Sequence, residues 1–167
     1  MPKGEIKPYD RERAVAYARK WALGRNPAYL NYDRLGGDCT NFASQCIYAG
    51  SGVMDYTPTF GWYYLSGSQK APAWTGVPYL YNFLLRPHNH GPVAVESDLS
   101  AIRPGDVVQL ATVKSHFHHT PVVIDVKGTP SLDTIFVAAH SDNVLGRPLS
   151  SYPIRKIRFL HITHVLS

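Results

Sequence analysis

The sequence lacks any apolar run long enough to cross a bilayer, which takes about 18 residues or more. Its first 25 residues are charged and polar, without the apolar stretch of about 7–15 residues that marks a secretory signal peptide. We therefore expect no membrane partner and no signal peptide within this chain. Localisation stays open: the chain as given is expected in the cytoplasm, or it reaches the cell exterior by a route or a segment that this sequence does not show.

No run of lysine or arginine stands out either, although the formal net charge is +5. A mild positive excess suits an anionic partner such as a wall polymer. No recognition motif accompanies the charge, so we expect no nucleic-acid partner. The oligomeric state is not indicated. Internal repeats, low-complexity tracts and linkers are also missing, and 167 residues suit one domain over residues 1–167 with a core of about 9–160.

Cysteine is scarce, with only two residues, Cys39 and Cys46. Both fall in the stretch GGDCTNFASQCIYAG, which reads as a helix that begins with Asp38 at the N-cap and runs to Gly50. Seven residues of helix separate two α-carbons by roughly 10 Å. A disulfide needs less than about 7 Å. We therefore expect two free thiols and no internal disulfide.

Apolar spacing predicts helices first and strands afterwards. The helices are expected over residues 9–24, 38–50 and 75–86, with loop over residues 51–73. A turn that leads into a strand is expected over residues 102–111, strands over 118–126 and 133–141, and one or two final strands over 152–165. This order indicates an α+β fold with an antiparallel sheet, and not alternating βαβ units. Aromatic residues between Tyr56 and Tyr81 either wall a binding groove or pin a loop to the core.

The two thiols differ in position. Cys46 lies in the middle of an apolar helical stripe and reads as a small core residue. Cys39 lies in the first turn, where free backbone N–H groups and the helix dipole stabilise a thiolate and later an oxyanion. Asp38 leaves two alternatives: its carboxylate raises the pKa of the thiol, or it turns away and caps the helix.

A nucleophilic cysteine needs a base and a group that orients the base. His119 begins the apolar run TPVVID, where a rigid strand can hold it in a cleft. His140 ends the next predicted strand and is placed to contact the second ring nitrogen of His119. His118 is adjacent and stays an alternative base, which strand alternation disfavours.

The runs GGDCTNFASQC, GDVVQL, HHTPVVID and AAHSDNVLGRPLSSY, in this order, resemble the "putative amidase domain" family related to NlpC/P60 and CHAP cysteine peptidases. The resemblance extends from about Tyr9 to Leu160. It implies a papain-like core of the NlpC/P60 type, with N-terminal helices packed on an antiparallel sheet. It also implies hydrolysis of amide bonds in peptidoglycan or another peptide, without a cofactor.

Residue by residue, the resemblance places the nucleophile at Cys39, the base at His119 and the third polar residue at His140. Asp142 and Asn143 are alternatives for that third residue. Tyr32 corresponds to a tyrosine that borders the oxyanion site in the related peptidases. The chain departs from the family in one respect, because Pro121 follows His119 and Thr120. His119 is therefore expected at an edge or at the very start of its strand.

Two other functions compete with a cysteine hydrolase. His116 and His118 have the spacing of two zinc ligands on a strand, and His88 and His90 form a second pair. A third ligand and a glutamate base are not evident, so no metal is expected. The other alternative is an inactive wall-associated or phage-associated binding module of the same fold.

Overall fold

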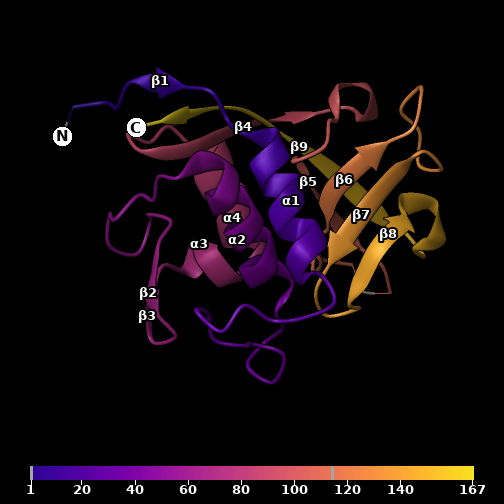
Figure 1. Ribbon diagram of the computed structural model, residues 1–167, viewed down its shortest axis with the longest axis horizontal. Coiled ribbons are helices and arrows are strands. Elements are labelled where there is room, and N and C mark those ends of the chain that lie inside the picture. Colours follow the sequence, from indigo (N-terminus) through magenta and orange to yellow (C-terminus); the bar gives the residue numbers. More distant parts are fainter. Residues whose placement is uncertain (1, 114) are drawn as a thin grey trace.

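The computed structural model describes residues 2–113 and 115–167. Its helices gather on one side of a curved antiparallel sheet, as Figure 1 shows. The helices are α1 (Arg11–Trp21), α2 (Cys39–Ser51), α3 (Pro72–Thr75) and α4 (Val77–Leu85), with short 3-10 turns at Leu99–Ala101 and Leu149–Ser151. The α+β class expected from the sequence is confirmed.

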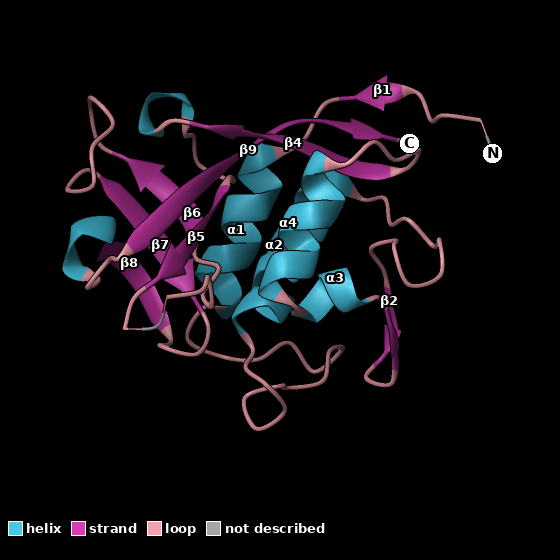
Figure 2. Ribbon diagram, turned by 180° about the vertical axis from the view of Figure 1, so that it is seen from behind, coloured by secondary structure: helices cyan, strands magenta, loops and turns pink. Residues whose placement is uncertain are grey.

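The larger sheet is built around one long strand, β9. Along the sheet the order is β1-β9-β5-β6-β7-β8, and β4 also pairs with β9 (Figure 2). Its strands are β1 (Ile6–Lys7), β4 (Gly91–Ser97), β5 (Val107–Ala111), β6 (Val122–Val126), β7 (Ile135–Ala139), β8 (Val144–Pro148) and β9 (Lys156–Leu166). The first part of β9 pairs with β5 and the rest with β4, so β9 links the two parts of the sheet.

The inner strands are buried on both faces. Val107 and Val122 join the helices in the larger core cluster, whereas their chain neighbours Val108 and Val123 belong to a second cluster. Adjacent side chains of a strand point to opposite faces, which explains the division. The second cluster includes Tyr152, and the strands therefore read as continuous apolar runs without alternation.

The two main helices lie close to their predicted bounds. Helix α1 begins after Asp10, whose carboxylate accepts a hydrogen bond from the Arg13 N–H. Helix α2 continues past Gly50 and ends at Gly52, which has the left-handed conformation typical of a helix end. A β-carbon at Gly50 would lie 2.6 Å from the Tyr9 ring. Gly50 thus permits close packing and is not the stop signal that the sequence suggested.

The sequence prediction missed several strands. Residues 51–73 contain a small hairpin of β2 (Tyr64–Ser66) and β3 (Gln69–Lys70), so they are not all loop. β4 and β8 were not expected. β8 has the sequence VLGRP, a composition typical of turns, and lies at the edge of the sheet, where glycine and proline are tolerated.

One buried carboxylate joins helix α1 to the sheet. Asp106, fully buried, accepts hydrogen bonds of 2.8 Å from Arg11 Nη1, from the Ile162 N–H and from His161 Nδ1. A fourth, of 2.9 Å, comes from the Arg103 N–H. Asp106 therefore fixes the start of α1, the turn before β5 and the centre of β9 in one arrangement.

We expect Asp106→Ala to lower the free energy of unfolding by about 3 kcal/mol, because it leaves the Arg11 charge without its buried partner. Urea denaturation followed by circular dichroism measures the change. Asp133→Ala, at an exposed position, is the control and should stay within about 0.5 kcal/mol. Equal stability of the two variants would show that Asp106 does not hold the fold together.

Candidate active site

The chain approaches α2 through a turn that requires glycine. Gly36 and Gly37 have φ angles of 101° and 105°, which disfavour residues with a β-carbon. The β-carbon position of Gly37 lies 3.7 Å from Ser141 Oγ, so the turn after β7 packs close to this approach. Cys39 follows as the first residue of α2 and is 7% exposed. The thiol therefore lies at the positive end of the helix dipole.

His119 lies beside this helix end, before its strand begins. It forms an isolated antiparallel bridge with Leu110, and β6 starts only at Val122. Thr120 Oγ1 lies 3.0 Å from Thr40 Oγ1, which ties the segment of His119 to the first turn of α2. This contact places the segment that carries His119 beside the start of α2.

The thiol and the imidazole change each other's proton affinity. Burial alone would raise the pKa of Cys39, but hydrogen bonding to His119 and its positive charge outweigh burial and lower it. Burial opposes protonation of His119, yet hydrogen bonding and the charges of Asp142 and Cys39 raise its pKa to about 9. The environment thus favours a thiolate–imidazolium pair.

Asp142 lies on the other side of the imidazole. Its Oδ1 is 3.5 Å from His119 Nε2, a long contact, and both atoms are buried without another hydrogen-bond partner. Asp142 Oδ1 and His119 Nε2 therefore face each other as the polar partners that remain. Because Nε2 faces Asp142, Nδ1 is the nitrogen available to the thiol. Burial raises the pKa of Asp142, but its bonds to His119 and Tyr152 have the larger combined effect and lower it.

Two residues that the sequence reasoning did not single out hold Asp142 in place. Its Oδ2 accepts hydrogen bonds from the Tyr152 hydroxyl at 2.5 Å and from Arg147 Nη1 at 3.1 Å. The Arg147 guanidinium also lies 3.6 Å from the centre of the Tyr152 ring. Both residues fall in the run AAHSDNVLGRPLSSY, whose resemblance to the family was the available signal.

The structure does not bring His140 to His119. His140 Nδ1 lies 2.5 Å from Asp38 Oδ2, and its Nε2 lies 2.8 Å from the carbonyl oxygen of Trp21. Both ring nitrogens therefore have partners elsewhere. The expected contact between His140 and His119 is thus absent, and Asp142 is the residue that lies at the second ring nitrogen of His119.

Asp38 fits neither of the alternatives stated for it. It is the N-cap residue of α2, but its carboxylate makes no capping hydrogen bond. Oδ1 accepts from the Tyr32 N–H at 2.8 Å and from Asn41 Nδ2 at 2.9 Å, while Oδ2 binds His140. Burial raises the pKa of Asp38, but these bonds, with His140 first, lower it overall. The carboxylate is committed to fixing the loop before the helix.

The remaining candidates lie around this centre in other roles. His118 Nε2 contacts Thr112 at its N–H and hydroxyl, at 3.1 and 2.8 Å, while its carbonyl oxygen lies 3.7 Å from Cys39 Sγ. Tyr32 donates its hydroxyl to the carbonyl of Gly67 at 2.8 Å. Asn143 accepts from Arg25 Nη2 at 3.2 Å. None of these contacts engages the His119 ring.

Neither a metal cluster nor a membrane helix is found in the part of the chain that the structure describes. No group of three or more His, Cys, Asp or Glu side chains there is placed to hold a metal ion. No described helix is long and apolar enough to cross a membrane. The histidine pairs noted in the sequence thus lack further ligands among residues 2–113 and 115–167.

Comparison with known proteins gives a family but no solved relative. Residues 8–163 match the family described as "Putative amidase domain". The uncharacterised protein YhbB of Bacillus subtilis (strain 168) is 35% identical over 125 residues, which cover 72% of this chain and 39% of that protein. The chain thus matches about two fifths of the length of this relative. No solved structure matches, so the papain-like core and the kinship with NlpC/P60 and CHAP peptidases stay predictions.

The two thiols should differ sharply in reactivity. We expect iodoacetamide to label Cys39 near neutral pH well before Cys46, because only the thiolate reacts. The pKa of Cys39 is lowered, whereas burial raises that of Cys46, which is fully covered. Peptide mass mapping after brief labelling at several pH values measures both rates.

The control separates the effect of the imidazole from that of the helix. His119→Ala removes the cation, so the labelling rate of Cys39 at neutral pH should fall. His116→Ala, at an exposed histidine, should leave the rate unchanged. Faster labelling of Cys46 in the wild type would contradict the assignment of Cys39.

Proposed function

We propose that this chain, which belongs to the putative amidase domain family, hydrolyses amide bonds with Cys39 as the nucleophile. The observation that carries the proposal is the alignment of three side chains. Cys39 lies at the start of α2, His119 lies against the thiol, and Asp142 faces the far nitrogen of the imidazole. This is the order that nucleophilic catalysis requires.

The proposed reaction begins from the thiolate–imidazolium pair. The Cys39 sulfur attacks the amide carbonyl carbon, and free N–H groups of the first turn of α2 stabilise the oxyanion. The His119 imidazolium then donates its proton to the leaving amine, and the C–N bond breaks. Water, deprotonated by the now neutral His119, attacks the thioester; the C–S bond breaks, the carboxylic acid leaves and the thiolate–imidazolium pair is restored. Asp142 keeps the ring in position throughout.

For the substrate we propose peptidoglycan, at a stem peptide or at an amide link to a wall sugar. The support is the resemblance stated for the sequence motifs, together with the net charge of +5, which suits an anionic wall. The relative from Bacillus subtilis is uncharacterised and adds no substrate.

Digestion of purified peptidoglycan, with mass analysis of the soluble fragments, tests this proposal. We expect fragments from an amide cleavage with the wild-type protein. Cys39→Ala should give at least a thousandfold lower rate, because it deletes the nucleophile. Thr134→Ala, away from the thiol, is the control. A chelator should not affect the rate, whereas an alkylating reagent should abolish it. Equal activity of Cys39→Ala and wild type would refute the cysteine mechanism.

Substitution of Asp142 should lower the catalytic rate, whereas substitution of His140 should lower the stability of the fold. Asp142→Asn keeps the shape but removes the charge that helps raise the pKa of His119. We expect kcat/KM to fall roughly 100-fold. We expect the basic limb of the wild-type pH–rate profile near pH 9, and the substitution should move it to lower pH because the imidazolium then loses its proton more readily.

His140→Ala should instead lower the melting temperature without moving that limb, because it leaves the Asp38 carboxylate without its buried partner. Asp133→Asn controls for a change of net charge at an exposed position. If the His140 variant shifts the basic limb and the Asp142 variant does not, the orienting role returns to His140.

A further inference from the structure

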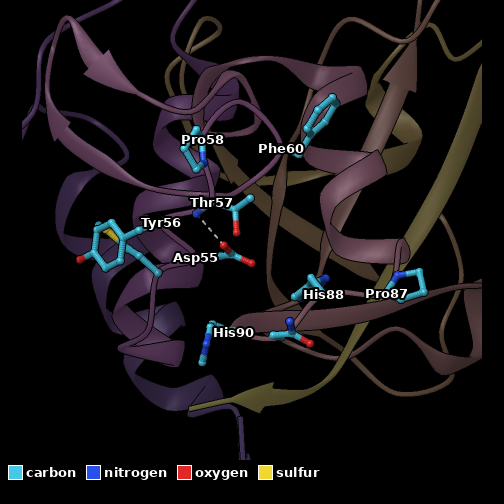
Figure 3. Close-up of a pocket in the computed structure, with 10 residues that line it drawn as sticks. Asp55, Tyr56, Thr57, Pro58, Phe60, Pro87, His88 and His90 are labelled. Atoms are coloured by element: carbon cyan, nitrogen blue, oxygen red, sulfur yellow. Dashed lines mark hydrogen bonds between the residues drawn. The ribbon is translucent and has the colours of Figure 1, made fainter. Parts of the chain in front are cut away.

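A hollow of about 840 Å³ opens at the end of α2 that lies opposite Cys39. Its residues come from the segment just after α2 and from the segment between α4 and β4, and Figure 3 shows them. Helix α2 has 13 residues and is therefore about 20 Å long. None of the residues that line the hollow takes part in the Cys39 site. The volume lies within the range of about 300–1,000 Å³ typical of ligand pockets.

A buried carboxylate faces into this hollow. Asp55 is 4% exposed, and its backbone is held by two hydrogen bonds with Trp62. Oδ1 accepts from the Thr57 N–H at 2.9 Å. The second oxygen has no hydrogen-bond partner among the described residues, and Figure 3 shows it directed to the side of the hollow where His88 lies. This oxygen is not among the fully covered atoms, so the hollow leaves it open to a hydrogen-bond donor.

Two aromatic rings stand exposed on either side of the carboxylate. Tyr56 is 61% exposed and Phe60 is 72% exposed, and Figure 3 places them apart, with Asp55 between. Phe60 also borders a second hollow of about 310 Å³, which extends along α4 past Asn82 and Arg86. The rings thus offer flat apolar faces along an elongated depression.

The far wall of the hollow is held rigidly. His88 Nδ1 lies 2.8 Å from the carbonyl oxygen of Arg86, and its Nε2 lies 2.8 Å from that of Pro92. The His88 ring also stacks on Phe83, with 4.2 Å between the ring centres. Preorganisation of this kind lowers the entropic cost of binding a ligand.

We propose that this hollow binds a carbohydrate chain. A sugar ring has an apolar face that stacks on an aromatic ring and hydroxyl groups at its edge that donate hydrogen bonds to a carboxylate. Exposed aromatic faces beside an unpartnered carboxylate oxygen fit both properties. A small organic cation fits less well, because Tyr56 and Phe60 stand on opposite sides of Asp55 and form no cage around it. The site is independent of the chemistry at Cys39.

Isothermal titration calorimetry with a chitin tetrasaccharide and with cellotetraose tests the proposal, in a Cys39→Ala background that prevents turnover. We expect one of the two to bind. Asp55→Asn keeps the acceptor for Thr57 but replaces the free oxygen, and Phe60→Ala removes one stacking face. Each should weaken binding roughly tenfold.

Leu65→Ala is the matched control, since Leu65 is 61% exposed and lies outside the hollow. It should bind like the parent protein. Thermal unfolding establishes that each variant is folded, and Phe60→Trp, which keeps a stacking face, should restore binding if Phe60→Ala loses it.

The proposal is overturned if the folded parent binds neither sugar at millimolar concentration, or if both Asp55→Asn and Phe60→Ala bind as the parent does. Binding of tetramethylammonium that depends on Asp55 would also overturn it in favour of a cation site. Because the assay needs no catalysis, its failure leaves the Cys39 mechanism standing, and loss of hydrolysis in Cys39→Ala says nothing against sugar binding.

Discussion

The buried carboxylate of Asp38 is the contact on which the candidate active site depends. It binds the Tyr32 N–H in the loop before α2, Asn41 in the helix and His140 at the end of β7. Arg25 Nε approaches the same carboxylate at 3.5 Å. The loop before α2, the first turn of α2 and the residue after β7, which is 102 positions along the chain from Asp38, thereby meet at one charge. It thereby connects the helix end that carries the thiol with the residue that leads into the turn of Asp142.

Two of the aspartate–histidine pairs of the described chain lie near Cys39, and they differ in their surroundings. Asp38 and His140 are almost fully covered, and their partners are all parts of the protein scaffold. Asp142 and His119 lie beside the thiol, and His119 keeps one nitrogen for it. A buried charge pair that is broken destabilises the fold, whereas a pair that shares protons with a reacting group changes the rate. On this reasoning, the pair that lies beside Cys39 affects the rate and the pair that lies away from the thiol affects stability.

The sequence was sufficient to predict the helix that begins at Cys39 and the later antiparallel strands. It also placed His119 at the very start of its strand. It was not sufficient to choose between His140 and Asp142, because the strand predicted over residues 133–141 has His140 at its end. The strand in fact ends at Ala139. Beyond that residue the direction of each side chain is set by the turn and by partners such as Asp38 and Tyr152, which are distant in sequence. Local patterns carry no information on such contacts.

Unusual backbone conformations occur beside Asp142 and beside Phe60. Among the described residues other than glycine, positive φ angles occur at Ser141 (77°), Asn143 (50°) and Thr59 (67°). The first two flank Asp142, and Thr59 precedes Phe60 in the proposed sugar site. Such conformations cost about 1–3 kcal/mol each and persist only where surrounding contacts fix them. Arg25 supplies such a contact to Asn143. Strain next to the residue that faces His119, and next to the most exposed ring of the hollow, is the distribution expected when a fold holds side chains in place for a ligand.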